Sequence, residues 1–196
     1  MIQRRRRLGP EAGTVRAVIL FVCTGNICRS PMAEGLLREI LEAAGSELEV
    51  ASAGTYGADA EPASGHAIRV LADRGIDIGA HRSRRLTCDL VDEADLVVAM
   101  TRSHEVAVAT LDQTARSRTF LAGEVVRLGG QAGARGVGDL VPAWAEALHA
   151  ARGGHMTTGR LADEVADPYG GSEDGYRRTA DRLDGICSAL ARLLEP

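Results

Sequence analysis

The sequence predicts an α/β fold in which a central parallel sheet of four strands lies between two layers of helices. Two observations predict it. Short apolar runs alternate with segments of helical periodicity, and the runs are continuously apolar, as in strands covered on both faces. The 196 residues suit one domain with a sizeable core. We expect residues 15–196 to form that domain, and residues 1–14, with four consecutive arginines, to be a flexible tail.

The first predicted strand leads into a loop that is typical of an anion site. Residues 18–22 are apolar and rich in β-branched side chains, and a short polar loop follows. We expect a helix over residues 31–44, with Ser30 as its N-cap and Pro31 as its first helical residue. Loop N–H groups and the positive end of the helix dipole would then bind phosphate.

A cysteine and an arginine stand at the two ends of this loop. Cys23 follows the strand, where a thiol loses its proton easily, and Arg29 comes six residues later. The spacing of a cysteine and an arginine six residues apart is weak evidence alone, because 4 cysteines and 23 basic residues give about half a match to this spacing by chance. The strand, loop and helix around it supply the specificity. The sequence therefore predicts attack of the Cys23 sulfur on a phosphate group. The alternative is a phosphate-binding loop in which the buried cysteine is incidental.

The other elements continue the alternation of strands and helices. Further strands are predicted over residues 47–53, 95–101 and 118–121, and residues 76–86 read as irregular. A helix after Pro62 ends at Gly75, and another helix contains Val106, Val108 and Leu111. Ser172 caps a terminal helix. The loop at Cys23 lies at the carboxyl end of its strand, where such folds place ligands.

Residues 129–163 differ in composition from the rest of the chain. They are rich in Gly, Ala and Arg, and Gly129 and Gly130 mark the start of a loop. A short helix is expected over residues 143–152. The segment has too few apolar residues for a core of its own, so it reads as an insertion within the domain. We hypothesise that it forms a lid or docking surface beside the loop that follows it.

Composition and charge exclude several classes of function. A net charge of −4 and 3% aromatic residues argue against a nucleic-acid partner. No segment is long and apolar enough to span a membrane, and no secretory signal is recognisable, so we expect a cytoplasmic protein without a membrane partner. The cysteines are then free or catalytic. We expect neither a metal nor a cofactor.

Four motifs together resemble the low-molecular-weight protein-tyrosine phosphatases. They are Cys23-Thr-Gly-Asn-Ile-Cys-Arg-Ser-Pro, Ser52-Ala-Gly-Thr, Ala94-Asp-Leu-Val and Asp167-Pro-Tyr, and their order matches over nearly the whole chain. The resemblance implies hydrolysis of a phosphomonoester through a phosphocysteine intermediate. Cys23 would attack phosphorus, Arg29 would hold two oxygens in a bidentate grip, and Asp167 would act as general acid and then base.

The resemblance also assigns supporting residues. Ser30 would steady the thiolate, and Asn26 would occupy a strained turn held by Ser52 and His81, although His81 also reads as a surface histidine. Tyr56 and Tyr169 are candidates for the pocket walls. The residues implied in phosphate or substrate binding are Thr24, Gly25, Asn26, Ile27, Cys28, Ser30 and Tyr169.

Alternative acids and the other cysteines complete the candidates. Asp163 and Asp174 are alternatives to Asp167 as the acid. Members of the family often carry a second cysteine in the loop, which implies that Cys28 can form a protective disulfide with Cys23. A packed thiol is the other interpretation of Cys28. Cys88 and Cys187 are expected in the core.

The substrate is predicted from two signals that conflict. Ile27 resembles the tyrosine-specific members, whereas Asp167-Pro-x-Gly-Gly-Ser resembles relatives that hydrolyse phosphoarginine and tend to have Thr in place of Ile27. We favour a phosphorylated tyrosine in a protein substrate, with a protein-arginine phosphatase as the alternative. An arsenate reductase, which needs two further cysteines close together, is a distant alternative, and so is a non-catalytic phosphate-binding module. A monomer or weak dimer is expected.

Overall fold

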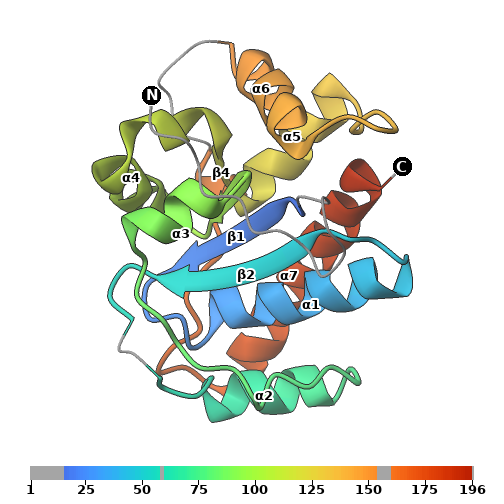
Figure 1. Ribbon diagram of the computed structural model, residues 1–196. Coiled ribbons are helices and arrows are strands. Elements are labelled where there is room, and N and C mark those ends of the chain that lie inside the picture. Colours follow the sequence, from blue (N-terminus) through green and yellow to red (C-terminus); the bar gives the residue numbers. More distant parts are fainter. Residues whose placement is uncertain (1–15, 58–59, 154–159, 196) are drawn as a thin grey trace.

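The computed structural model describes residues 16–57, 60–153 and 160–195. Figure 1 shows a sheet between two layers of helices, which confirms the predicted α/β fold. The sheet is parallel and has the strand order β2-β1-β3-β4. The strands are β1 (Val18–Cys23), β2 (Glu49–Gly54), β3 (Leu96–Ala99) and β4 (Thr119–Leu121).

Helices connect the strands and cover both faces of the sheet. Helices α1 and α7 pack against each other on one face, with α2 beside α7, and α3 and α4 lie on the opposite face (Figure 1). The helices are α1 (Arg29–Ala43), α2 (Gly65–Ala72), α3 (Cys88–Glu93), α4 (Arg102–Leu111), α5 (Ala122–Ala132), α6 (Val141–Ala151) and α7 (Glu173–Leu194), with the 3-10 turns η1 (Gln113–Arg118) and η2 (Leu161–Asp163).

The register of the sheet places the ends of β1 and β2 side by side. Cys23 pairs with Gly54, and Val22 pairs with Ala99 of β3. Because all the strands run in the same direction, their carboxyl ends meet at one edge of the sheet. The loop after β1 therefore lies against the ends of both neighbouring strands.

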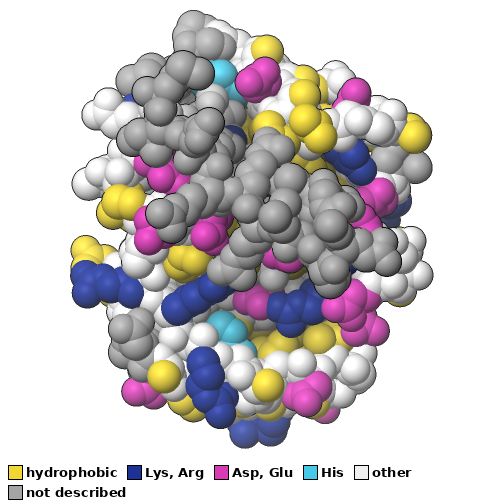
Figure 2. Space-filling view, in the orientation of Figure 1, with side chains coloured by type: hydrophobic (Ala, Val, Ile, Leu, Met, Phe, Trp, Pro, Cys, Tyr) yellow, Lys and Arg dark blue, Asp and Glu magenta, His cyan; other side chains and the backbone are white. Residues whose placement is uncertain are grey.

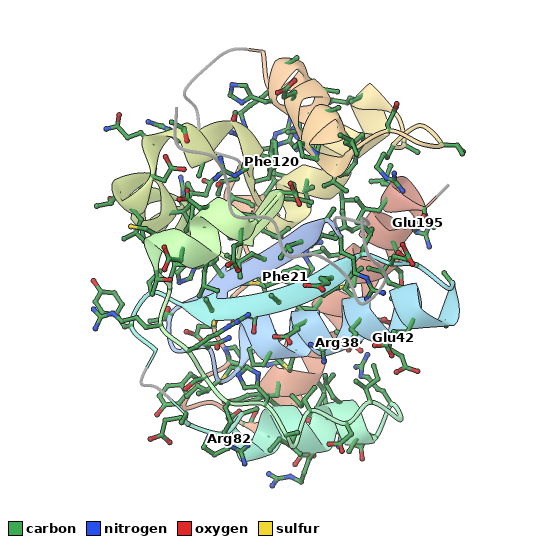
Figure 3. The ribbon with its side chains drawn as sticks, in the orientation of Figure 1. Phe21, Arg38, Glu42, Arg82, Phe120 and Glu195 are labelled. Carbon is green, nitrogen blue, oxygen red and sulfur yellow. The ribbon has the colours of Figure 1, made fainter. Side chains whose placement is uncertain are left out.

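Alternate side chains of the central strands β1 and β3 enter two separate apolar clusters. Phe21 of β1 and Phe120 of β4 lie in the larger cluster with α1, α5, α6 and α7, and both are labelled in Figure 3. Leu20 and Val97 enter the smaller cluster with α3 and α4. Full burial of such a side chain stabilises the fold by about 1.5–3 kcal/mol. The continuous apolar runs of the sequence reflect this burial on both faces.

Helix α1 begins earlier than predicted. Its first residue is Arg29 and its N-cap is Cys28, so the predictions of Ser30 as N-cap and Pro31 as first residue are wrong. The backbone N–H of Met32 already donates to the Cys28 carbonyl at 3.2 Å. Ser30 forms hydrogen bonds within the loop instead of capping the helix, as described below.

The structure also revises other local expectations. Helix α5 passes through Gly129 and Gly130, so a loop does not begin there. Helix α3 was not predicted. Its first residue, Cys88, is exposed, so the prediction of a core position is wrong, whereas Cys187 is fully buried. In α4, Val108 is buried, whereas Val106 and Leu111 are exposed.

The part of residues 129–163 that the structure describes shares the core of the domain. Trp144 and Leu148 of α6 belong to the larger apolar cluster. Arg152, the C-cap of α6, donates to Glu124 of α5 at 2.8 Å and lies 4.5 Å above the Phe120 ring. Residues 154–159, and the tail predicted at residues 1–14, lie outside the described residues. Within the described residues, no helix is long and apolar enough to cross a membrane.

Candidate active site

The Cys23 side chain lies at the end of β1 and is almost fully buried. Its Sγ is 2.9 Å from the Ser30 hydroxyl oxygen, and the backbone N–H of Asn26 donates to Sγ at 3.3 Å. The first contact comes from the first turn of α1, and the second comes from the loop that joins β1 to α1. Two polar groups of this region therefore contact the Cys23 sulfur directly.

Asn26 holds the shape of the loop. Its backbone is left-handed, with φ at 53°, and its side chain is completely buried. The Nδ2 atom donates to Ser52 Oγ at 2.7 Å and to Ser30 Oγ at 2.9 Å, while Oδ1 accepts from the backbone N–H of Arg84. The His81 ring is 2.8 Å from the Asn26 carbonyl oxygen through Nε2. The structure thus brings together the residues that the sequence pointed to around this strained turn.

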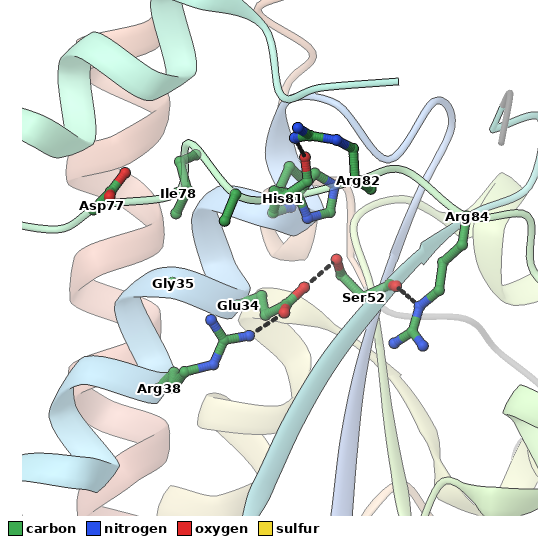
Figure 4. A pocket seen from close by; sticks show the side chains of 11 residues that line it. Glu34, Gly35, Arg38, Ser52, Asp77, Ile78, His81, Arg82 and Arg84 are labelled. Carbon is green, nitrogen blue, oxygen red and sulfur yellow. Dashed lines mark hydrogen bonds and ion pairs between the residues drawn. The ribbon is translucent and has the colours of Figure 1, made fainter. Parts of the chain in front are cut away.

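The same network continues to a polar cavity behind the loop. Ser52 donates to Glu34 of α1, which pairs with Arg38 one turn later, and Arg84 Nε donates to the Ser52 carbonyl at 2.8 Å (Figure 4). The cavity has a volume of about 380 Å³. Figure 2 shows arginine side chains gathered on this face, over the region between β2 and α2. Arg82 also lines the cavity.

Gly54, at the end of β2, packs directly against the backbone of the loop after β1. A Cβ atom at this position would lie 2.6 Å from the Thr24 carbonyl oxygen and 2.9 Å from the Asn26 nitrogen. Both contacts are to backbone, so any other residue would displace the loop. The sequence contained this glycine within the Ser52-Ala-Gly-Thr motif, but the close approach depends on the pairing of β1 with β2.

Arg29 lies at the far end of the loop with its side chain only 4% exposed. Its Nη2 donates to Asp167 Oδ2 at 2.5 Å and to Thr24 Oγ1 at 3.2 Å, and its Nη1 donates to the Val165 carbonyl at 3.3 Å. The buried Nε atom has no hydrogen-bond partner among the described residues. A buried guanidinium with an unused donor is suited to bind an anion.

Asp167 is the one of the three candidate acids that contacts Arg29, and its side chain is 43% exposed. Asp163 is buried and pairs with Arg127 at 2.8 Å, and Asp174 is exposed in the first turn of α7. Tyr169 donates its backbone N–H to Asp167 Oδ1, but its side chain is 69% exposed. Tyr56 is likewise exposed, and the part of either ring in a pocket wall stays a prediction.

A second cavity, of about 510 Å³, opens on the Asp167 side of the loop. Its lining includes Thr24 and Arg29 from the loop, and His104 of α4. Leu161 and Glu164, from the end of the 129–163 segment and just after it, also line it. Sequence reasoning missed His104 and Leu161. The spacing of Thr101 and His104, typical of a capping box at a helix start, was the available signal.

Cys28 faces two neighbouring helices. Its Sγ is 3.2 Å from the Tyr176 hydroxyl of α7 and 3.4 Å from the Ser64 hydroxyl at the start of α2. Burial raises the pKa of the Cys28 thiol, so the thiol form is favoured. Burial also raises the pKa of Tyr176, to about 12. The role of Cys28 as a redox partner of Cys23 stays a prediction.

The described residues contain no cluster of three or more side chains that could hold a metal ion. What the site does contain is a buried cysteine in a loop that begins a helix, a buried arginine with an unused donor, and an exposed carboxylate beside it. This arrangement defines the class of cysteine-dependent phosphatases.

The chain belongs to the low molecular weight phosphotyrosine protein phosphatase family, whose model matches residues 18–131. The phosphocysteine mechanism is a general feature of this family. The chain is 35% identical over 177 residues to a protein-arginine-phosphatase of Bacillus subtilis, covering 90% of this chain and 96% of the relative. It is 40% identical to the low molecular weight protein-tyrosine-phosphatase Etp of Escherichia coli, covering 90% and 93%.

Solved structures agree with this assignment. The crystal structure of a low molecular weight protein tyrosine phosphatase from T. tengcongensis superposes with a TM-score of 0.70 at 33% identity, covering 91% of this chain and 99% of that one. A mutant of YwlE from Bacillus subtilis gives 0.69 at 33% identity, covering 90% and 97%. The chain is therefore a cysteine-dependent phosphatase with relatives of two substrate types.

Proposed function

We propose that this chain hydrolyses phosphotyrosine in a protein substrate, with Cys23 as nucleophile, Arg29 as phosphate ligand and Asp167 as general acid and base. The observation that carries the proposal is the Cys23 thiol, held 2.9 Å from the Ser30 hydroxyl in a loop that ends at a buried arginine. A nucleophile, a cation and an acid then face one phosphoryl group.

In the first step the Cys23 sulfur attacks phosphorus, an S–P bond forms and the P–O bond to tyrosine breaks. Asp167 gives its proton to the departing oxygen, and Arg29 and the loop N–H groups from Thr24 to Ser30 stabilise the charge on the phosphoryl oxygens. The 43% exposure of Asp167 lets its carboxyl take that proton from solvent beforehand.

In the second step water attacks the phosphocysteine. Asp167, now ionised, takes a proton from the water, the S–P bond breaks, and inorganic phosphate leaves. The Ser30 hydroxyl donates to the sulfur as the thiolate returns, which makes it a better leaving group. The same carboxyl thus serves as acid and then as base.

Ile27 supports phosphotyrosine over phosphoarginine. Its side chain is partly exposed at the loop and packs against the larger apolar cluster. An apolar group there favours a phenyl ring, because a guanidino group pressed against it would lose hydrogen bonds to water at a cost of about 1–3 kcal/mol. The alternative, phosphoarginine, is supported by the Bacillus subtilis relative and by the Asp167-Pro-x-Gly-Gly-Ser sequence.

The experiment compares phosphotyrosine and phosphoarginine peptides as substrates of the wild type, Cys23→Ser and Cys88→Ser. Cys88 is an exposed thiol on α3 and provides the matched control. We expect phosphotyrosine turnover that Cys23→Ser abolishes and Cys88→Ser retains. Preference for phosphoarginine, abolished by Cys23→Ser and retained by Cys88→Ser, would transfer the proposal to the arginine alternative. Absence of turnover of both peptides would overturn it.

Arsenate reduction has little support from the placement of the thiols. Cys88 lies on α3 beside the smaller apolar cluster, and its Sγ is 3.8 Å from the Leu111 carbonyl. Cys187 is buried on α7, on the opposite face of the sheet, and contacts the Ala33 carbonyl. Two thiols on opposite faces cannot pass a disulfide from one to the other.

A further inference from the structure

His104 reaches the phosphate loop from a helix that lies outside it. The ring is 3% exposed, and its Nε2 is 3.0 Å from Thr24 Oγ1. Its Nδ1 is 3.1 Å from the Thr101 backbone nitrogen and 2.9 Å from Thr101 Oγ1. His104 thus takes the place at the start of α4 that Glu or Gln commonly takes in a capping box.

The backbone of Thr101 determines which ring nitrogen of His104 carries the proton. The Thr101 N–H can only donate, so Nδ1 must accept, and the proton of the neutral ring is on Nε2. Burial, followed by the charge of Arg29, lowers the pKa of His104 to about 4, which keeps the ring neutral. Asp167 and Glu164 are the acidic groups that act on the ring in the opposite direction. His104 Nε2 therefore donates to Thr24.

The Thr24 hydroxyl oxygen accepts two hydrogen bonds. One comes from His104 and the other from Arg29 Nη2 at 3.2 Å, the same nitrogen that donates to Asp167. Both lone pairs of Thr24 Oγ1 are then in use, and its own proton is left for a third group in the cavity that Thr24 lines. The chain His104, Thr24, Arg29 fixes the plane of the guanidinium.

We propose that His104 is a positioning residue for phosphoryl transfer. By donating to Thr24, it holds the hydroxyl oxygen as an acceptor for Arg29 and so keeps the Arg29 Nε and Nη groups aimed at the phosphate. This inference rests on the proposed role of Arg29 as phosphate ligand. Without the His104 donor, Thr24 can rotate, and the guanidinium loses one of the three groups that orient it.

Three substitutions separate positioning from simple stability. His104→Leu removes both ring contacts, whereas His104→Gln keeps an acceptor for Thr101 and a donor for Thr24. Thr24→Val removes the intermediate hydroxyl. We expect His104→Leu to lower kcat on a phosphotyrosine peptide about tenfold and to weaken inhibition by inorganic phosphate by a similar factor, and His104→Gln to recover most of both.

The coupling between His104 and Thr24 is tested by combining their substitutions. If His104 acts through Thr24, the double variant His104→Leu with Thr24→Val has about the same kcat as either single variant. Thr87→Ala is the control, because Thr87 caps α3 through Leu90 and the substitution removes a helix cap of similar kind. It should lower thermal stability without changing kcat or phosphate inhibition.

The outcomes distinguish the two proposals. If the wild type turns over substrate and His104→Leu has the same kcat, the role of His104 is overturned and the phosphatase proposal stands. The same holds if the losses of the two single variants add in the double variant. Failure of His104→Gln to recover more activity than His104→Leu, with both variants folded by thermal unfolding, would also overturn it. No turnover by the wild type would count against the proposed function itself.

Discussion

The two sides of the catalytic cleft are built in different ways. On the nucleophile side, Cys23, Asn26 and Ser52 are nearly or fully buried, and Asn26 makes hydrogen bonds through its side chain and backbone to five other residues. On the acid side, Asp167 is 43% exposed and is oriented by one ion pair and one backbone donor. The first side is rigidly positioned, and the second is accessible to water.

This difference follows from what each side must do. A sulfur nucleophile needs a fixed approach to phosphorus, and buried polar groups that are fully hydrogen-bonded hold a strained turn in place. A general acid must regain its proton in each turnover, so contact with solvent is an advantage. We expect substitutions on the first side to disturb geometry and those on the second side to disturb proton transfer.

The largest effect is expected for Gly54→Ala, which breaks the rigid side. The new Cβ would lie 2.6 Å from the Thr24 carbonyl oxygen, so the loop or β2 must move. We expect kcat/KM on a phosphotyrosine peptide to fall about 100-fold or more. Gly185→Ala on α7 is the control, since no described atom lies within 4 Å of its Cβ position, and it should leave activity unchanged. Wild-type activity of Gly54→Ala would show that the loop tolerates displacement.

Asp167→Asn tests the accessible side. It should lower kcat about 100-fold on phosphotyrosine, because the leaving oxygen receives no proton, and much less on an aryl phosphate with a good leaving group. Thermal stability should hardly change, because the ion pair with Arg29 is exposed on the Asp167 side. Asp174→Asn, an exposed acid on α7, should behave like the wild type. Equal losses on both leaving groups would contradict an acid role.

Glu105→Gln extends the comparison to a buried acid without full partners. Glu105 of α4 lies 3.7 Å from Arg152, and its Oε2 has no partner among the described residues. Burial and the nearby Glu124 raise its pKa to about 7. The folded state therefore keeps a proton that the unfolded chain loses above an ordinary value of about 4.5, so stability falls as pH rises from about 4.5 to 7.

Removing this carboxyl should flatten that decline. We expect Glu105→Gln to be about 1–3 kcal/mol more stable than the wild type at pH 8 and to show little difference at pH 4.5, measured by urea unfolding. Glu146→Gln, at an exposed position of α6, should reproduce the wild-type pH dependence. If the free energy of unfolding of Glu105→Gln has the same pH dependence as that of the wild type, the raised pKa of Glu105 is contradicted.

The smallest effect is expected for Leu161→Ser at the rim of the acid side. Leu161 is 70% exposed and lines the cavity that contains Arg29 and Asp167. If this end of the 129–163 segment contacts the substrate chain, KM for a phosphotyrosine peptide should rise about threefold with kcat unchanged. A small aryl phosphate should show no change. Equal KM values for the peptide would remove the docking hypothesis for Leu161.

Sequence reasoning succeeded where the signal was local. The four strands follow from continuous apolar runs, and the loop after β1 follows from the residues that interrupt the first run. It failed where a residue's environment comes from elsewhere. Cys88 was expected in the core because thiols are usually buried, but it starts a short helix whose buried residue is Val91. Ser30 was expected to cap α1, but the loop uses its hydroxyl at Cys23.

His104 and Gly54 show the same limit in the site. His104 lies 80 residues from Thr24 along the chain, and its capping-box spacing gave no indication of that contact. Gly54 belonged to a motif, but the 2.6 Å approach appears only when β2 pairs with β1. Neither role can be derived from neighbouring residues.

The sequence by itself determined the first strand, the loop with Cys23 and Arg29, and the presence of the helix that follows, because consecutive residues fix these through local backbone preferences and burial pattern. Only the tertiary structure decided which distant groups complete the site. Asp167 meets Arg29 across 138 residues, and Ser52 meets Asn26 across 26. These contacts depend on the register of parallel strands and the packing of the connecting helices, which bring distant loops to the same edge of the sheet.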